Sequence, residues 1–252
     1  MPTDAYTQAI RALGDLGQMR VWSLLVTVFG DLAPDAPLDG PTLSAIMAEI
    51  GIKPEATRVA LHRLRSDGWV TSTKQGRTSA HGLTAKGQRD SAAARQQIYG
   101  LPDQMGRAVG VILTPAPCDL DSTLFAQLAP RVYLCGDGTA LPADALLLTP
   151  AELPPWLGRQ VETDTLRDAY KSLHAVLTDI DLELTDASLL APLHHAVLRV
   201  MIVHAWRRLT LKHPDLPRAA HSPEWRGHDC RALVTKLLAR FPRPDLDAIK
   251  PL

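Results

Sequence analysis

Apolar residues recur at helical spacing on both sides of a short turn early in the chain. Leu43, Ile46, Met47 and Ile50 stand three or four residues apart, which places them on one face of a helix. Gly51 follows this segment, and a second helix is predicted over 54–68, because proline suits a first helical turn and glycine the position after the last one. The pattern therefore predicts two amphipathic helices joined by a tight turn.

A β-hairpin is predicted directly after the second helix. The stretch 70–83 holds a polar turn at 75–77 between two short strands, and a polar helix is expected from Thr84 to Tyr99. Helix, tight turn, helix and small hairpin is the order of a winged helix-turn-helix, a module that places one helix in the DNA major groove. We therefore predict a winged helix-turn-helix DNA-binding domain over residues 1–100.

Two helices are expected ahead of this motif. One covers Asp4–Leu13, and the other starts at Gln18 and ends at Gly30. The second carries one apolar face, formed by Trp22, Leu25, Val26 and Phe29.

Short strands and helices alternate over residues 101–160. Strands are expected at Val109–Thr114, Arg131–Cys135 and Ala145–Leu148, the last of them buried. Helices are expected at Leu120–Leu128 and Pro150–Leu157. This β-α-β-β-α order predicts a small ferredoxin-like middle domain.

Residues 161–252 are predicted to be helical. Apolar residues at helical spacing mark helices at Thr163–Asp179 and Leu189–Lys212, and a third is expected at Asp229–Phe241. The chain is thus expected to be an α+β multidomain protein with an α-helical C-terminal effector or dimerisation domain.

The second helix of the predicted motif separates into two faces. At about 100° per residue, Thr57, Ala60, Leu61 and Leu64 point toward the core. Arg58, Val59 and His62 point the other way, where hydrogen-bond donors and a small apolar side chain suit base edges and phosphates.

Positive charge gathers on the same segment, although the whole chain has a net charge of zero. Nine basic residues stand against three acidic ones between Lys53 and Arg95. Such an excess favours phosphate contacts, and the alternative is an ordinary solvated face. The candidate DNA contacts are Lys53, Arg58, Val59, His62, Arg63, Arg65, Lys74 and Arg77.

A second group of candidates lies late in the chain. Several cations at one end of a long helix could bind an anionic ligand. The candidate effector residues are His204, Arg207, Arg208 and Lys212. Two alternatives remain open: the cations form a solvated, salt-bridged face, and His204 is a hydrogen-bonded core histidine.

Catalytic, metal and membrane chemistry have little support in the sequence. Seven of the nine histidines lie between His174 and His228, yet no His-x₃-His or Cys-x₂-Cys pair and no Gly-x-Ser-x-Gly elbow occurs. We therefore expect no enzyme activity, no catalytic or metal-binding residues and no cofactor. The three scattered cysteines suit a reducing cytoplasm, and the apolar run 21–29 is too short to span a membrane.

Two blocks of the chain resemble a known family. RVWSLLVTVFGD, the helix with Arg58 and Arg63–Leu64, DGWV and the QGR–S wing are similar to the PaaX-type regulators of phenylacetate catabolism. The run VMIVHAWRRLTLKHPDLP followed by PEWRG resembles the same family's C-terminal signature.

The resemblance implies a homodimeric transcriptional repressor with a middle domain of ferredoxin-like, Cas2-like fold. It implies binding to a palindromic double-stranded DNA operator of a catabolic operon. It also implies release by an aryl-CoA thioester effector such as phenylacetyl-CoA. The middle block TLFAQLAPRVYLCGDG departs from the aromatic, glycine-rich sequence of the family, so the effector stays open.

Two other classes of function compete with this interpretation. One is a winged-helix protein-interaction module without operator specificity. The other is a nuclease, suggested only by the Cas2-like middle domain, and Asp119 and Asp121 resemble helix caps rather than metal ligands.

Overall fold

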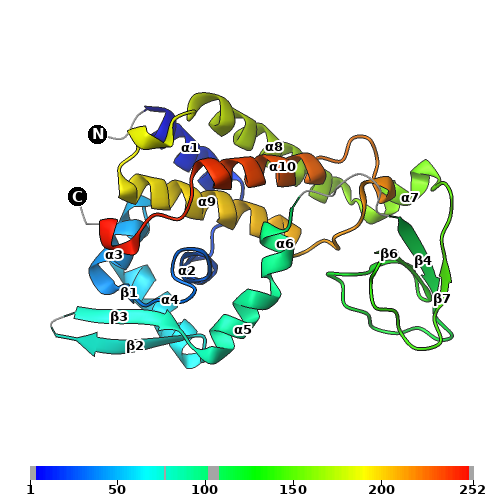
Figure 1. The fold of residues 1–252 in the computed structure, drawn as a ribbon, viewed down its shortest axis with the longest axis horizontal. Coiled ribbons are helices and arrows are strands. Elements are labelled where there is room, and N and C mark those ends of the chain that lie inside the picture. The colour runs from blue at the N-terminus through cyan, green and yellow to red at the C-terminus, as the bar shows by residue number, and fades with distance from the viewer. Residues whose placement is uncertain (1–3, 77, 102–107, 250–252) are drawn as a thin grey trace. The chain divides into compact units, whose positions relative to one another are not determined.

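The computed structural model describes residues 4–76, 78–101 and 108–249. The chain divides into two compact units, both visible in Figure 1. The first unit contains residues 1–96, 176–205 and 236–252, and the second contains 97–175 and 206–235. Helices and two antiparallel sheets confirm an α+β fold. The division into consecutive domains 1–100, 101–160 and 161–252 stays a prediction.

Helices and one small sheet make up the N-terminal part of the first unit. The helices are α1 (Asp4–Asp15), α2 (Val21–Thr27), a π-helical turn η1 (Val28–Leu32), α3 (Gly40–Glu49) and α4 (Pro54–Ser66). The strands are β1 (Leu38–Asp39), β2 (Val70–Gln75) and β3 (Thr78–Leu83), in the order β1-β3-β2. Helices α5 (Ala85–Ala93) and α6 (Arg95–Tyr99) follow, so the single polar helix expected from Thr84 is in fact two.

The turn between α3 and α4 forms as the sequence predicts. Gly51 adopts φ +85°, a left-handed conformation that favours glycine, and Pro54 opens α4. The apolar residues Leu43, Ile46 and Met47 of α3 are buried together with Thr57, Ala60 and Leu64 of α4. Leu61, which was also predicted to face the core, is only half-buried.

Gly30 does not end the helix that begins at α2. The chain continues through Gly30 as the π-helical turn η1, which extends to Leu32. This turn places the buried carboxylate of Asp31 against the guanidinium of Arg199, at 2.8 Å and 3.0 Å. This ion pair accounts for the continuation of the helix past Gly30, because removing a buried carboxylate from its charged partner is energetically costly.

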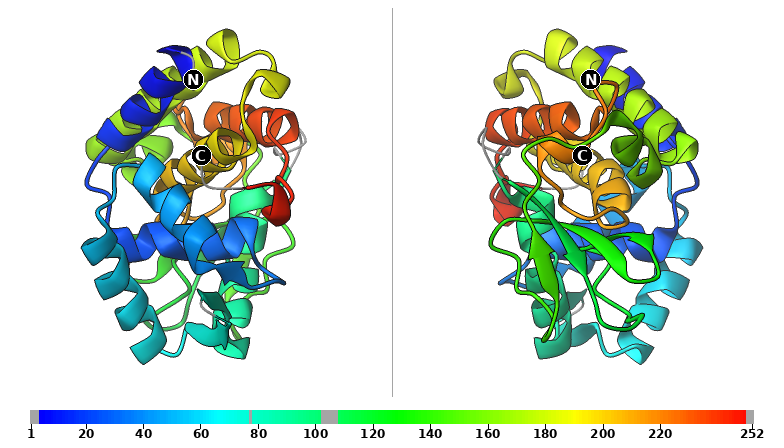
Figure 2. Two further views of the ribbon diagram at one scale, coloured as in Figure 1. Left: turned by 90° about the vertical axis from the view of Figure 1, so that its left-hand side faces the viewer. Right: turned by 90° about the vertical axis from the view of Figure 1, so that its right-hand side faces the viewer.

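The second unit contains a four-stranded antiparallel sheet of β4 (Val109–Leu113), β5 (Ala126–Ala129), β6 (Val132–Gly136) and β7 (Leu146–Leu148). Its order is β5-β6-β4-β7, and the right-hand view of Figure 2 looks toward these strands. The strands predicted around Val109, Arg131 and Ala145 are confirmed within one or two residues.

The helix predicted at Leu120–Leu128 is wrong. The Asp121 carboxylate accepts hydrogen bonds from the backbone N–H and the hydroxyl of Thr123, at 2.8 Å and 2.6 Å, and closes a local turn. The chain then continues as β5, because the edge of β6 supplies its hydrogen-bond partners. Over residues 108–149 the structure contains no helix between the strands, so the ferredoxin-like, Cas2-like assignment is not confirmed.

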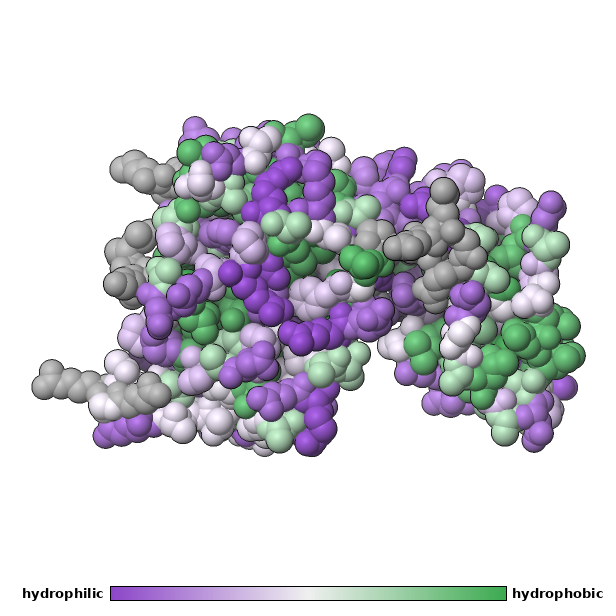
Figure 3. Space-filling view, in the orientation of Figure 1, coloured by the Kyte–Doolittle hydropathy of each residue, from purple (hydrophilic) through white to green (hydrophobic). Residues whose placement is uncertain are grey.

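The strand predicted as buried at Ala145–Leu148 is instead an exposed edge. Leu146, Leu147 and Leu148 of β7 are 58 %, 45 % and 45 % exposed. Figure 3 shows hydrophobic atoms gathered over this part of the second unit. A continuous apolar run cannot by itself distinguish a central strand from an edge strand.

The remaining helices follow the predicted order. They are α7 (Pro155–Val161), α8 (Asp164–Glu183), α9 (Pro192–Thr210) and α10 (Gly227–Arg240), with short 3-10 turns η2 (Ala187–Leu189), η3 (Arg218–Ala220) and η4 (Leu246–Ala248). The boundaries between the two units fall within α6, α8, α9 and α10.

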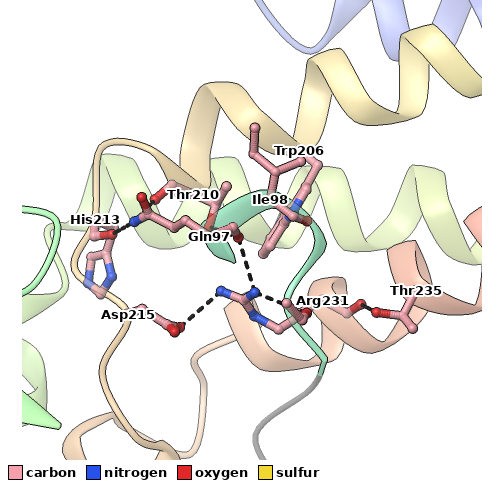
Figure 4. A network of polar contacts seen from close by, with 9 residues as sticks. Gln97, Ile98, Trp206, Thr210, His213, Asp215, Arg231 and Thr235 are labelled. Carbon is pink, nitrogen blue, oxygen red and sulfur yellow. Dashed lines mark hydrogen bonds and ion pairs between the residues drawn. The ribbon is translucent and has the colours of Figure 1, made fainter. Parts of the chain in front are cut away.

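A polar network in the second unit holds the segment that follows α5 (Figure 4). The Gln97 side-chain amide donates to the carbonyl oxygens of Thr210 and His213, at 2.7 Å and 2.8 Å. Arg231 donates to the Gln97 carbonyl oxygen at 3.1 Å and to the Asp215 carboxylate at 2.9 Å. The indole N–H of Trp206 donates to the carbonyl oxygen of Ile98. These contacts anchor the end of α6 against the last turn of α9.

Candidate functional site

The face of α4 that the sequence assigns to DNA is exposed. Arg58, His62 and Arg65 are all exposed, and Val59 is 71 % exposed although it is apolar. The opposite face of α4 is buried against the core, so the helix is fixed in rotation and presents these four side chains outward.

A hollow of about 740 Å³ lies along this face. Arg58, Val59, His62 and Arg65 of α4 line it on one side. Residues of α3, the α3–α4 turn and strand β3 complete it, among them Gly40, Leu43, Ser44, Ile52, Ser79 and His81. The structure therefore brings half of the predicted contacts together around one concavity.

The cations at this hollow are not neutralised by nearby acids. Within residues 4–76, 78–101 and 108–249, no carboxylate pairs with Arg58 or Arg65. Arg63 differs, because it lies over the Trp22 ring at 5.3 Å and pairs with Asp67 at 3.8 Å. Arg58 and Arg65 are thus open to an incoming anion.

Three further predicted contacts, Lys53, Arg63 and Lys74, do not line the hollow. Lys53 precedes the first turn of α4 and is exposed. Lys74 lies on β2 near the hairpin turn and is also exposed. Arg77 lies outside the described residues.

His81 is a candidate contact that sequence reasoning missed. It lies on β3, lines the hollow, and its Nδ1 is 2.8 Å from the Ser72 hydroxyl. Burial, and then the positive charge of Arg65, lower the pKa of His81 below its ordinary value. Alternation along β3 could have placed it on the same face as the half-buried Leu83, and only the tertiary structure places it at the hollow beside the exposed face of α4.

The structure does not group the four candidate effector residues. His204 belongs to the first unit, where it is buried and its Nδ1 is 3.0 Å from the Thr27 hydroxyl. This geometry favours the core-histidine alternative. Arg207, Arg208 and Lys212 belong to the second unit.

Lys212 alone of these four lines a cavity of about 490 Å³ in the second unit. The cavity is bounded by the segment leading into β5, the first turns of α8 and the last turn of α9. Arg207 and Arg208 are half-buried on α9 and do not line it.

Three histidines of the second unit cluster beside Trp225: His213 and His221 contact its ring, and His228 contacts His221. His221 stacks on the Trp225 ring at 4.8 Å, and the ring centres of His213 and His228 lie 5.2 Å and 5.0 Å from that of His221. The buried carboxylate of Glu162 accepts hydrogen bonds from the backbone N–H and hydroxyl of Ser222, at 2.7 Å and 2.6 Å. Nδ1 of His221 lies 3.2 Å from the same carboxylate.

Neither a metal cluster nor a membrane span is found in the part of the chain that the structure describes. No group of three or more histidine, cysteine or acidic side chains in these residues could hold a metal ion. No helix among them is long and apolar enough to cross a membrane.

Two family models match the chain. Residues 20–87 match the model described as PaaX-like protein, and residues 162–245 match the model described as PaaX-like protein C-terminal domain. Together they cover more than half of the sequence. The chain belongs to the PaaX-like family. The first match contains all eight candidate DNA contacts, and the second contains all four candidate effector residues.

Individual relatives of this PaaX-like chain are distant. The transcriptional repressor PaaX of Escherichia coli (strain K12) is 24 % identical in an alignment 237 residues long, and the alignment covers 79 % of this chain and 72 % of the relative. A solved structure of the uncharacterized protein Rv0674 from Mycobacterium tuberculosis superposes with a TM-score of 0.53 and 19 % identity. That similarity covers 90 % of this chain and 97 % of the other, and it concerns the fold alone.

Proposed function

We propose that this PaaX-like chain is a transcriptional repressor that binds DNA through a winged helix-turn-helix formed by α3, α4 and the β2–β3 hairpin. The order of these elements, with a tight turn at Gly51, supports the proposal. The Escherichia coli relative is named a transcriptional repressor, and we extend that role to this chain.

The exposed face of α4 is the observation that carries the proposal. Arg58 and His62 offer hydrogen-bond donors to base edges, and the isopropyl group of Val59 suits a thymine methyl group. Val59 is 71 % exposed in the free protein, so water contacts most of its apolar surface. Contact with a base would remove that apolar surface from water, which is favourable.

The remaining cations serve the phosphate backbone in this proposal. Lys53, Arg63, Arg65 and Lys74 lie along α4 and on β2, and Arg77 is assigned by its place in the hairpin sequence alone. Phosphate contacts fix the register of the helix in the groove and contribute affinity without sequence information.

Two copies of the chain would bind one palindromic operator. Half-sites of such an operator lie about 34–36 Å apart, or a multiple of that distance, because the recognition helices enter successive major grooves. Analytical ultracentrifugation of the free and the DNA-bound protein tests this part. A strict monomer in both conditions would rule it out.

An aryl-CoA thioester would release the repressor from its operator. This part rests on the resemblance to PaaX-type regulators. Operator binding titrated with phenylacetyl-CoA, coenzyme A and phenylacetate tests it, and insensitivity to all three would exclude the effector while leaving DNA binding in place.

A genome-wide binding profile followed by operator affinities of variants tests DNA recognition. Arg58→Ala and His62→Ala should each reduce discrimination between the operator and mismatched sites by ~1–3 kcal/mol. Lys74→Ala should weaken binding to all sequences equally and reduce the salt slope by about one. Arg11→Ala on α1 is the matched control, because Arg11 is exposed and lies outside the hollow.

Two results would contradict the proposal. Unchanged operator affinity in both α4 variants would remove the site assignment. Weak, sequence-independent binding with a steep salt dependence and no operator would favour a protein-interaction module instead.

A further inference from the structure

We propose that the cavity beside the last turn of α9 binds the acyl part of an organic anion with an apolar body. The inference rests on the proposed function for its regulatory meaning, because an effector needs a site distinct from the DNA-contacting face. The binding step itself is measured without DNA.

The walls of the cavity are largely apolar. Its volume of about 490 Å³ lies in the range of small-molecule sites. The apolar wall comprises Phe125, Ala126, Val161, Leu166, Ala169, Leu209 and Pro214. An aromatic or branched acyl group would bury its surface against these side chains.

The polar groups of the cavity select an anion. Lys212 lines the cavity, is exposed, and has no carboxylate partner among the residues that the structure describes. Thr163, Thr165 and Ser122 add hydroxyl groups. An uncompensated ammonium beside hydroxyl donors favours a ligand with a carboxylate or phosphate at one end.

Ligand binding in this cavity can be coupled to the proposed DNA-binding elements through the turn that ends α9. Leu209, Lys212 and His213 come from the turn that ends α9, and the carbonyl oxygens of Thr210 and His213 in the same turn accept from Gln97. Gln97 lies on α6, which follows α5 and the β2–β3 hairpin directly along the chain. A ligand that shifts this turn therefore changes the anchor of the segment that leads to the hairpin.

Isothermal titration calorimetry on the full chain tests the site, with phenylacetyl-CoA, phenylacetate and coenzyme A as probes. Phenylacetyl-CoA and phenylacetate share the acyl group and differ in their anionic part. Comparing their affinities therefore shows whether the site prefers a CoA thioester or a free carboxylate. We expect at least one acyl probe to bind the wild-type protein and coenzyme A alone to bind at least tenfold more weakly.

Two variants change the site directly. Ala169→Phe fills the cavity, and Lys212→Gln removes its cation, so each should weaken binding of the acyl probe at least tenfold. Ala175→Phe and Lys171→Gln are matched controls on α8, since both positions are exposed and line no part of the cavity. Circular dichroism melts show whether each variant is folded.

The outcomes separate this inference from the proposed function. Binding of no acyl probe, or wild-type affinity in a folded Ala169→Phe variant, overturns the site. Acyl binding that Ala169→Phe removes supports the site even if no operator is found, in which case only the proposed function fails.

Discussion

The side-chain amide of Gln97 donates to the backbone carbonyl oxygen of His213 at 2.8 Å, across more than a hundred residues of sequence. A second bond from the same amide reaches Thr210 at 2.7 Å. Gln97 thus satisfies two carbonyl groups at the end of α9, where a helix leaves such groups without intrahelical partners.

Replacing Gln97 tests two roles of this contact: stabilising the fold, and coupling the acyl site to operator binding. Gln97→Ala should lower the free energy of unfolding by ~1–3 kcal/mol, because two carbonyl oxygens lose their donor. If the acyl site acts through this turn, the variant should bind the acyl probe with wild-type affinity but show a smaller effect of the probe on operator affinity. Urea denaturation and operator titrations measure the two effects. The neighbouring exposed Gln96→Ala is the control, and equal behaviour of the two variants would exclude both roles.

The buried ion pair between Arg199 and Asp31 should be costly to break. Arg199→Met removes the charged partner that lies 2.8 Å from the buried Asp31 carboxylate, while Arg243 stays at 3.6 Å, and should reduce the free energy of unfolding by ~3–5 kcal/mol. The exposed pair Arg11–Asp15 supplies the control, since Arg11→Met should change it by less than ~1 kcal/mol. Chemical denaturation measures both, and equal losses would contradict the structural role of Asp31.

Gly87 should not tolerate a side chain. A Cβ at this position would collide with the backbone carbonyl oxygen of Trp69, so Gly87→Ala should destabilise the protein by ~1–3 kcal/mol. Gly14→Ala in α1 is the matched substitution, because the nearest atom to its Cβ is 4.0 Å away. Alanine favours a helix over glycine, so that variant should be neutral or up to ~1 kcal/mol more stable. Thermal melts distinguish the two, and a stable Gly87→Ala protein would contradict the close approach of α5 to Trp69.

Stability should fall as the solution becomes acidic, because of the histidines around Trp225. Burial, and then the positive charge of His221, lower the pKa of His213 to about 4 and that of His228 to about 3, from an ordinary 6.5. Between the lowered pKa of His213 in the folded protein and its ordinary pKa of 6.5, the unfolded chain binds more protons than the folded one. The stabilising contribution is therefore complete above pH 6.5 and is lost progressively as the pH falls toward 4. His213 alone should account for roughly 3 kcal/mol by pH 4.

Urea denaturation between pH 7.5 and pH 4.5, a range chosen to bracket most of this window, checks the effect. Glu162, Arg218, Asp229 and Arg231 also act on these histidines, so the comparison is made between variants and not on the wild-type slope alone. His213→Gln should show a shallower pH dependence than the wild-type protein, and the exposed Gln96→Ala, which removes no titratable group, should retain the wild-type slope. Identical slopes in all three proteins would contradict the assignment.

The local pattern determined the α3–α4 turn and the hairpin. Helical spacing of apolar residues, a glycine that adopts φ +85° and a proline in the first helical turn are all local signals, and α3, α4, β2 and β3 form within a few residues of their predicted bounds. The exposure of Arg58, Val59 and His62 follows from the same spacing, since the rotation of α4 is fixed by its buried residues.

Local signals failed where distant residues supply the partner. The Asp121 capping signal predicted a helix, but the edge of β6 draws the chain into β5 instead. Gly30 was expected to stop a helix, but burial of Asp31 against Arg199, 168 residues away, extends it as a π-helical turn. The acyl cavity likewise joins residues from 122–127, 161–169 and 209–214, so no single stretch of sequence could show it.

The sequence by itself determined the elements whose stability comes from neighbouring residues, together with the α4 face and its surplus of cations. Only the tertiary structure decided which of those cations lie at one hollow, that His204 is held by Thr27, and that Lys212 lines a cavity. The physical reason is that burial and ion pairing depend on contacts between residues far apart in the chain, which periodicity and composition do not encode.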